Sequence, residues 1–430
     1  MSTDRFERDL PDLLAQLAPR AVPDYRDDIV RQTADMRQRP AWMFPERWLP
    51  VSVITSRAFA APPIRWRVVG VVVLLLALAI GLALVAGSQR HLPTPFGPAA
   101  NGSVAYEKGG DVYTVDPVTG VSTAVITGPE TDINPRWSRD GTRMAFERKV
   151  NGDSGPGVLY VARADGSHIV QLKTAAPIAE ISNYDFSPDG KELLITYGST
   201  YPRFLIAASD GSGVRKLDVA TPAGAAAWRP PDGSEILMMD VDDGLRPWLC
   251  CGIHAVNAAT GSIRDILAVE PGRFRCCARW SPDGRLISFA EWDPDADGLT
   301  VETHIIAADG TRESILPSPP GTVWQATESW SNDGTRMLVI RGYTSDLPGA
   351  RPVAIPVDGS GTGVEIELPG VVNPADPLAW EWAPDDSLIL GALGEDGAHL
   401  DQVLLDPVAG TSRTLPWSSV SLPSWQRTVH

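Results

Sequence analysis

The chain has 430 residues, of which 43% are hydrophobic and 21% charged, a composition typical of a folded protein that can bury a sizeable core. Its formal net charge of −16 argues against nucleic-acid binding, because that activity depends on clustered Lys and Arg. The 39 Gly and 38 Pro indicate many tight turns and therefore many short strands.

The first 66 residues are expected to form a short helical segment. Apolar residues recur at helical spacing within residues 2–20 and again within residues 23–38, which predicts two short amphipathic helices. We expect residues 1–66 to lie in the cytoplasm, where they either bind a cytoplasmic partner or only tether the chain to the bilayer.

A membrane-spanning helix is predicted next, at residues 67–88. Val68 to Gly87 is a run of 20 residues without a charged side chain, which matches a helix that crosses roughly 30 Å of hydrocarbon. The run is too long and too far from the start for a cleaved signal peptide. More Arg residues flank its N-terminal side than its C-terminal side, so the N-terminus is expected to stay inside. The chain is then a single-pass protein of the cell membrane with an extracytoplasmic domain.

After a linker at residues 89–100, one motif returns through the whole remaining region, residues 101–428. Its copies are WSRDGTRMAF, FSPDGKELLI, WRPPDGSEIL, WSPDGRLISF, WSNDGTRMLV and WAPDDSLILG, which begin at Trp137, Phe186, Trp228, Trp280, Trp330 and Trp382. The aromatic residue is expected to end an inner strand, the Asp-Gly pair to make a turn, and the apolar residues to start the next strand. Copies about 42 to 52 residues apart are typical of four-stranded propeller blades.

A second pattern, an apolar strand running into a turn, occurs seven times, for example LYVARADG at 159–166 and HIIAADG at 304–310. The second pattern thus occurs once more than the first motif, which has six copies. This difference is explained if the two ends of the region share one blade. Residues 103–120 read as outer strands without an inner strand, and residues 421–427 read as a lone inner strand with Trp425 in the motif position. We therefore predict an all-β fold, a seven-bladed β-propeller closed by N- and C-terminal strands in one blade, with six blades as the alternative.

The W-S-P-D-G turn, the apolar strand and the A-D-G-type turn resemble the TolB-like family of WD-like β-propeller repeat proteins of the bacterial envelope. The resemblance covers residues 100–428 and implies the fold; the function stays open, because propellers serve as binding scaffolds, receptors and enzyme domains. Three departures from the pattern stand out: Phe186 in place of Trp, the inserted residue of WRPPDG, and Asp386 in place of Gly.

The leading functional hypothesis is a non-enzymatic, membrane-anchored envelope protein whose propeller binds a protein, a peptide or a glycan. One alternative is a transmembrane signalling regulator, because a short cytoplasmic segment joined by one helix to an exported domain resembles the layout of membrane-bound anti-sigma factors. A second alternative is an enzyme, a hydrolase or a lyase, built on the central channel. The sequence identifies no catalytic or cofactor-binding residue.

The four cysteines form two adjacent pairs, Cys250–Cys251 and Cys276–Cys277. An extracytoplasmic location favours disulfides, although four cysteines allow three connectivities. Zinc is the less favoured interpretation, since adjacent cysteines lack the usual ligand spacing.

Asp293, Asp295 and Asp297 followed by Gly298 reproduce the first half of a calcium-binding loop. The position of the bidentate Glu is occupied by His304, so a polar hairpin tip is the favoured interpretation and calcium the alternative.

The motif aromatics are predicted to pack between blades as the repeat core rather than to form a ligand cage. This set comprises Trp137, Phe186, Trp228, Trp280, Trp330, Trp382 and Trp425.

Overall fold

The computed structural model divides the chain into two units, Met1–Gly87 and Ser88–His430. It describes residues 96–150, 155–174, 178, 180–198, 202–219, 223–240, 252–270, 273–293, 300–344, 349–369, 379–393, 400–419 and 421–428. The helical segment predicted at 1–66 and the membrane helix predicted at 67–88 lie outside the described residues. None of the described residues forms a helix that could cross a membrane.

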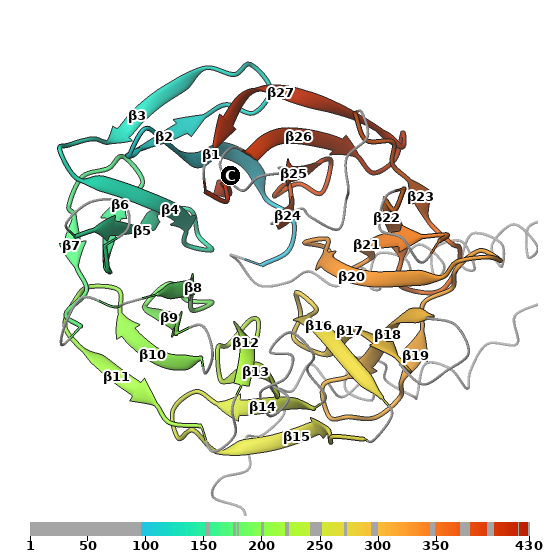
Figure 1. The fold of residues 1–430 in the computed structure, drawn as a ribbon. Coiled ribbons are helices and arrows are strands. Elements are labelled where there is room, and N and C mark those ends of the chain that lie inside the picture. Colours follow the sequence, from blue (N-terminus) through green and yellow to red (C-terminus); the bar gives the residue numbers. More distant parts are fainter. Residues whose placement is uncertain are drawn as a thin grey trace, which may run out of the picture. The chain divides into compact units, whose positions relative to one another are not determined.

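The described part of the second unit is all-β, and its strands form antiparallel four-stranded sheets around a common centre (Figure 1), an arrangement consistent with a β-propeller. The first sheet contains β28 (Ser424–Thr428), β1 (Ala100–Lys108), β2 (Asp111–Val115) and β3 (Ser122–Ile126), in that order. The second contains β4 (Thr131–Trp137), β5 (Arg143–Lys149), β6 (Gly157–Arg163) and β7 (Val170–Gln171).

The next two sheets repeat this pattern. The third contains β8 (Ile181–Phe186), β9 (Glu192–Tyr197), β10 (Arg203–Ala208) and β11 (Val214–Leu217). The fourth contains β12 (Ala223–Trp228), β13 (Glu235–Asp240), β14 (Ile253–Asn257) and β15 (Ile263–Leu267).

An eight-stranded sheet follows, made of two antiparallel meanders joined by one parallel bridge between Val301 and Trp324. The first meander contains β16 (Phe274–Trp280), β17 (Leu286–Trp292), β18 (Val301–Ala307) and β19 (Ser314–Ile315). The second contains β20 (Trp324–Trp330), β21 (Arg336–Gly342), β22 (Arg351–Pro356) and β23 (Val364–Glu365). The last sheet contains β24 (Ala379–Trp382), β25 (Ile389–Leu393), β26 (Leu400–Asp406) and β27 (Thr411–Ser419).

The repeated motif forms the turn between the first two strands of a sheet. In the first copy the Ser138 hydroxyl donates to the Asp140 carboxylate at 2.6 Å, and Gly141 takes a φ of 67°. The same Ser–Asp bond recurs at Ser281–Asp283 and Ser331–Asp333. Ser, Asp and Gly are favoured at these places because the side chains fix the turn and glycine tolerates positive φ.

The core lies between neighbouring sheets. One cluster joins Leu237 of β13 and Ile253 of β14 to Trp280 of β16 and Phe289 of β17. Each motif aromatic is buried in this manner, with exposed fractions between 3% for Trp425 and 9% for Trp330. Apolar side chains on both faces of each sheet therefore hold the sheets against one another.

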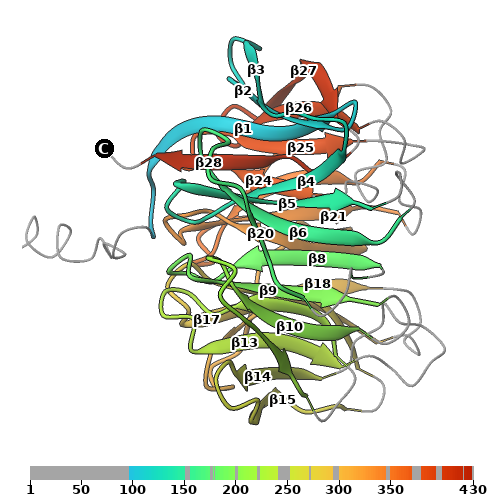
Figure 2. The ribbon, with the colours of Figure 1, turned by 90° about the vertical axis from the view of Figure 1, so that its left-hand side faces the viewer.

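The two ends of the described region meet in one sheet. β28 pairs antiparallel with β1, and the two strands lie side by side in Figure 2. In this pairing Trp425 lies opposite Val104. The indole nitrogen of Trp425 also donates to the carbonyl of Gly102 at 3.1 Å. Strands more than 300 residues apart thus share backbone hydrogen bonds.

Candidate functional site

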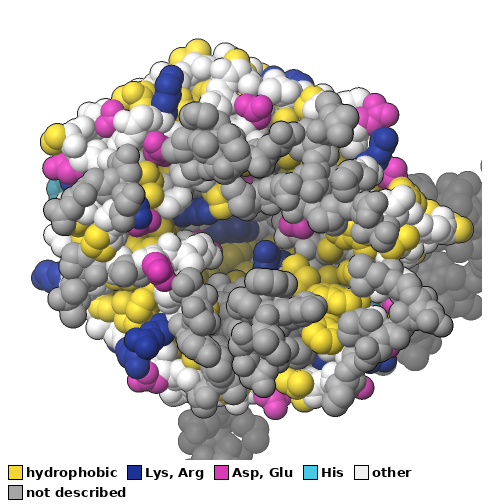
Figure 3. All heavy atoms as spheres, viewed as in Figure 1, with side chains coloured by type: hydrophobic (Ala, Val, Ile, Leu, Met, Phe, Trp, Pro, Cys, Tyr) yellow, Lys and Arg dark blue, Asp and Glu magenta, His cyan; other side chains and the backbone are white. Residues whose placement is uncertain are grey.

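A hollow lies at the centre of the sheets, and arginine side chains line it (dark blue in Figure 3). It consists of two adjoining spaces of about 660 and 720 Å³, which share Arg136, Arg139, Arg279, Trp330 and Asn332 among their lining residues. We refer to the two together as the central cavity. Each of the two spaces is within the range of small-molecule sites, roughly 300–1,000 Å³.

The residue directly before the motif aromatic lines the central cavity in every sheet. These residues are Arg136, Asp185, Ala227, Arg279, Ser329, Glu381 and Ser424. Side chains alternate along a strand, so when the aromatic packs into the core, its predecessor points another way. Each copy of the repeat therefore supplies one aromatic core residue and, directly before it, one cavity residue whose type differs from copy to copy.

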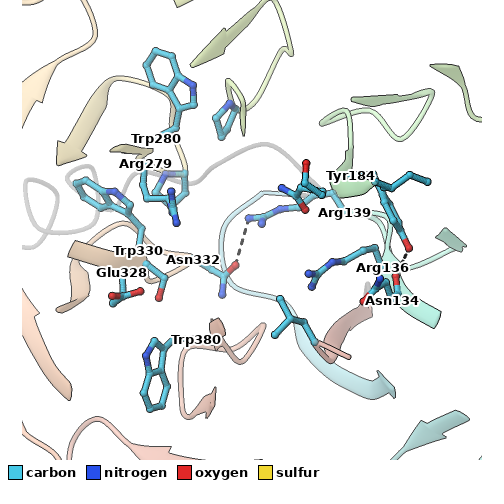
Figure 4. Close-up of a pocket in the computed structure, with 17 residues that line it drawn as sticks. Asn134, Arg136, Arg139, Tyr184, Arg279, Trp280, Glu328, Trp330, Asn332 and Trp380 are labelled. Atoms are coloured by element: carbon cyan, nitrogen blue, oxygen red, sulfur yellow. Dashed lines mark hydrogen bonds between the residues drawn. The ribbon is translucent and has the colours of Figure 1, made fainter. Parts of the chain in front are cut away.

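β-Bulges bring further side chains to the cavity. The pairing register shifts between Ile133 and Arg136 in β4, between Cys276 and Arg279 in β16, and between Thr327 and Ser329 in β20. The extra residue in β20 is Glu328, which lines the cavity near Arg279 (Figure 4). Bulges re-aim side chains in this way because two residues oppose one on the partner strand.

Four arginines, which we call the cavity arginines, carry the positive charge of this site: Arg136, Arg139, Arg279 and Arg427. Among the residues that the structure describes, none of the four has a carboxylate oxygen within 4.0 Å, whereas the surface arginines Arg148, Arg229 and Arg264 all do. Arg279 is exposed to the cavity, and its guanidinium donates to the carbonyl of its own neighbour Ala278. The cavity arginines are thus not neutralised by direct ion pairs with described residues.

The carboxyl groups of the cavity carry raised pKa values. Burial raises the pKa of Glu328 to about 7 against the opposing effect of Arg279. Burial likewise raises the pKa of Glu381 to about 7, although Arg136 and a hydrogen bond from the Trp425 amide favour its charged form. Near neutral pH these groups are only partly ionised, so they offset the arginines incompletely.

One end of the cavity holds a hydrogen-bonded cluster around Asn332. The Asn332 side-chain oxygen accepts from Arg427 at 2.6 Å and from Arg139 at 3.3 Å, the second of which is drawn in Figure 4. The Asn332 amide nitrogen donates to Asp386 at 2.9 Å and to the carbonyl of Ala383 at 3.0 Å. These bonds fix which end of the amide faces the arginines. We call Arg139, Asn332, Asp386 and Arg427 the Asn332 cluster.

The segment before β1 lies against this cluster. The carbonyl of Gly97 accepts a hydrogen bond from Arg427, and the Arg139 guanidinium lies 5.0 Å from the centre of the Phe96 ring. The Ala99 amide donates to the carbonyl of Pro384 at 2.8 Å. Figure 1 shows this segment running from β1 to the middle of the ring, so it covers part of one cavity end.

The sequence analysis did not identify these residues as a site, although differences between the motif copies could have indicated it. Arg139 and Asn332 occupy the motif position that is proline in WSPDG, and Asp386 occupies the glycine position. Arg139, Asn332 and Asp386 all meet in the Asn332 cluster, whereas the other two departures, Phe186 and the inserted residue of WRPPDG, lie outside it.

The predicted repeat-core aromatics are buried, and all seven also line one or both spaces of the central cavity: Trp137, Phe186, Trp228, Trp280, Trp330, Trp382 and Trp425. Cys276 and Cys277 lie on β16, where Cys277 takes a φ of 63° in the bulge. Cys250 and Cys251 lie outside the described residues, so the disulfide pairing stays a prediction.

Of the predicted calcium loop, the structure describes Asp293, whereas Asp295 and Asp297 lie outside the described residues. His304 lies on β18, where its ring stacks on Phe289 and bonds to Glu313 at 2.6 Å. Over the described ranges, no group of three His, Cys, Asp or Glu residues is arranged to hold a metal ion.

No protein-family model matches the chain, and no curated protein sequence matches it significantly. Solved structures resemble it at low identity. An oligogalacturonate lyase from Vibrio parahaemolyticus is 14% identical, with a TM-score of 0.51 over 74% of this chain and 86% of the other. A prolyl endopeptidase is 13% identical, with a TM-score of 0.52 over 74% of this chain and 50% of the other.

TolB from Acinetobacter baumannii is 13% identical to this chain, with a TM-score of 0.44 over 77% of this chain and 81% of the other. The structures similar to this chain thus include TolB and enzymes. Together with the sheets described above, the likeness to the lyase and the endopeptidase shows a β-propeller fold.

Proposed function

We propose that the chain is a non-enzymatic, membrane-anchored binding protein whose central cavity takes a carboxylate-bearing ligand, the acidic end of a peptide or of a glycan. The observation that carries the proposal is the set of four cavity arginines without a carboxylate partner among the described residues. Guanidinium groups form strong, paired hydrogen bonds with carboxylates. A ligand that brings such groups would supply the missing partners.

The contrast with the rest of the chain strengthens this proposal. A net charge of −16 repels anions from the surface in general, so a local excess of arginine in a cavity is a specific feature. The raised pKa values of Glu328 and Glu381 reduce the competing negative charge inside it. The low dielectric of a partly enclosed site increases the attraction between a ligand carboxylate and these arginines.

Binding of two probes to the full chain in detergent tests the proposal: trigalacturonate for an acidic glycan and triglutamate for an acidic peptide. Isothermal titration calorimetry is expected to detect one of them. Arg279→Gln removes a charge that is exposed to the cavity and should lower the affinity about tenfold or more, since a charge-assisted hydrogen bond contributes about 1.5–3 kcal/mol.

Arg143→Gln is the matched control, because Arg143 lies in the first motif copy outside the cavity and bonds to Ser209 and to the carbonyl of Gly190. It should bind as the wild type does. The proposal fails if neither probe binds, or if Arg279→Gln leaves the affinity of the probe that binds unchanged.

An enzyme acting on the same ligand is a second candidate, favoured by one observation. Carboxyl groups with a pKa of about 7, such as those of Glu328 and Glu381, are suited to general acid–base catalysis near neutral pH. The similar oligogalacturonate lyases make trigalacturonate the first substrate to test. Cleavage that is lost in Glu328→Gln while probe binding persists would support an enzyme; an intact probe would support the binding protein.

The proposal includes a ring of seven blades closed by the two ends of the chain. Supporting it, the described strands group into units of four, and the β28–β1 pairing completes the unit formed by β1, β2 and β3. Closure would leave no long unpaired sheet edge.

Membrane anchoring by residues 67–88 is part of the same proposal and rests on the apolar run Val68–Gly87. Protease added to intact cells should digest the propeller but not residues 1–66. Protection of the propeller would contradict the exported location. Capture of a cytoplasmic protein by residues 1–66 would instead favour a signalling role.

A further inference from the structure

Two guanidinium groups, one buried and one half-buried, share a single neutral acceptor in the Asn332 cluster. Arg427 is 7% exposed, and Arg139 lies with it on the same amide oxygen of Asn332. Neither arginine has a carboxylate oxygen within 4.0 Å among the described residues. Two like charges that share one uncharged oxygen repel each other, and an anion between them would remove this cost.

Hydrogen-bond donors without a partner also indicate a ligand site between Arg139 and Arg427. Within the described part of the chain, the Nε atoms of Arg139 and Arg427 are both buried and have no hydrogen-bond partner. Buried polar groups in native proteins nearly always have a partner, which is often a ligand or an ordered water. Burial also lowers the pKa of Arg139 and lowers that of Arg427 to about 9, although the carboxyl groups of Glu381 and Asp386 act in the opposite direction.

The surroundings hold the two arginines in place for such a ligand. Asp386 and the carbonyl of Ala383 bind the amide nitrogen of Asn332, so its oxygen must face Arg139 and Arg427. The Phe96 ring lies over Arg139, and the Gly97 carbonyl accepts from Arg427. Each guanidinium is thus positioned from two sides, which lowers the entropic cost of binding.

We propose that Arg139 and Arg427 form an oxyanion subsite at this end of the central cavity, with Asn332 as the residue that orients both. The subsite takes one carboxylate of the ligand and therefore rests on the proposed function. Asn332 is also the specificity-determining residue, because a carboxylate at this position would neutralise the pair from within the chain. Arg136 and Arg279 then contact other parts of the ligand.

The test measures binding of trigalacturonate, triglutamate and sodium sulfate to the full chain in detergent. Sulfate, a small oxyanion, should compete with the larger probe for this subsite. Arg139→Gln and Arg427→Lys should lower the affinity for sulfate and for the larger probe about tenfold or more. Arg279→Gln should lower only the affinity for the larger probe, and Arg143→Gln should change neither.

Melting temperatures of all variants accompany the titrations. If Arg427→Lys unfolds the protein, Arg139→Gln alone decides the outcome, because Arg139 lies in a turn outside the sheet. The subsite is refuted, and the proposed function kept, if the larger probe binds, Arg279→Gln weakens it, and folded Arg139→Gln binds it as the wild type does. Absence of binding by both larger probes refutes the proposed function itself.

Discussion

Asp386 adopts a strained backbone conformation and makes hydrogen bonds to the turn between β20 and β21. It stands at the glycine position of the motif with a φ of 61°, a conformation that costs an L-residue roughly 1–2 kcal/mol. Its carboxylate accepts from the backbone amides of Asn332 at 2.6 Å and Asp333 at 2.8 Å, and from the Asn332 side chain. The substitution therefore adds three hydrogen bonds between two neighbouring turns.

Asp386→Gly should relieve the backbone strain and yet destabilise the protein. The loss of hydrogen bonds to a charged group, each about 1.5–3 kcal/mol, exceeds the relief, so we expect the free energy of unfolding to fall by about 1–3 kcal/mol. Urea denaturation measures the change. Asp386→Asn, which keeps one acceptor oxygen and tolerates positive φ, should lose less; an Asp386→Gly variant as stable as the wild type would contradict this account.

The stability of the propeller should depend on the charge of Glu381. Because burial raises its folded pKa from 4.5 to about 7, its contribution to stability is present below about pH 4.5 and is lost as the pH rises through about 7. We expect the wild-type melting temperature to be lower at pH 8 than at pH 5.

Glu381→Gln should reduce this difference between pH 5 and pH 8, since the amide does not titrate. Glu367→Gln is the control, because the Glu367 side chain is 81% exposed and should leave the pH dependence unchanged. If Glu381→Gln shows the same pH slope as the wild type, Glu381 is not the titrating group.

At the residue scale, the sequence predicted the core better than the cavity. Trp280 and its equivalents recur in every copy because core packing imposes the same demand on each blade. Arg279 and its equivalents vary, because the cavity makes no such demand, and a variable position carries no signal in a search for repeats. Only the departures Arg139, Asn332 and Asp386 could have directed attention to the site before the structure was known.

At the scale of elements, the turns between first and second strands differ in what they touch. A Cβ added to Gly141 would lie 1.9 Å from the carbonyl oxygen of Arg427 in β28, whereas one added to Gly190 would meet nothing closer than 3.9 Å, at Ser138. The two glycines have nearly equal φ values, 67° and 70°. The first turn therefore packs directly on the C-terminal strand, and the equivalent turn in the next sheet is free of such contact.

Gly141→Ala should destabilise the protein more than Gly190→Ala. Both variants bear the same backbone strain of roughly 1–2 kcal/mol, so the difference between them isolates the clash with β28, about 1–3 kcal/mol by analogy with overpacked cores. Chemical denaturation of the pair measures it. Equal losses would mean that the turn of the second sheet does not rest on β28.

The motif also predicted the elements themselves. The apolar run after each motif turn forms β5, β9, β13, β17, β21 and β25, because a strand buried on both faces reads as a continuous apolar run. The bulges in β4, β16 and β20 were not predictable, since a bulge depends on which partner residues a strand meets, and the motif does not encode this.

At the scale of the whole molecule, removal of Leu422–His430 should markedly lower the stability of the propeller. The deletion takes away β28, exposes the hydrogen-bonding edge of β1, and removes Trp425 from a cluster with Val104 and Leu390. We expect a lower melting temperature and increased aggregation. Removal of Thr428–His430 alone is the milder control, and an unchanged melting transition after the longer deletion would count against closure through β28.

The pairing of β28 with β1 also constrains when the protein can finish folding. β28 is synthesised more than 300 residues after β1, and until it is available the inner edge of β1 is open to pairing with other chains. Contacts between such distant segments form slowly because a long loop must close first. Completion of the first sheet must therefore wait until β28 has been synthesised, and we expect the newly made chain to need protection by a chaperone until then.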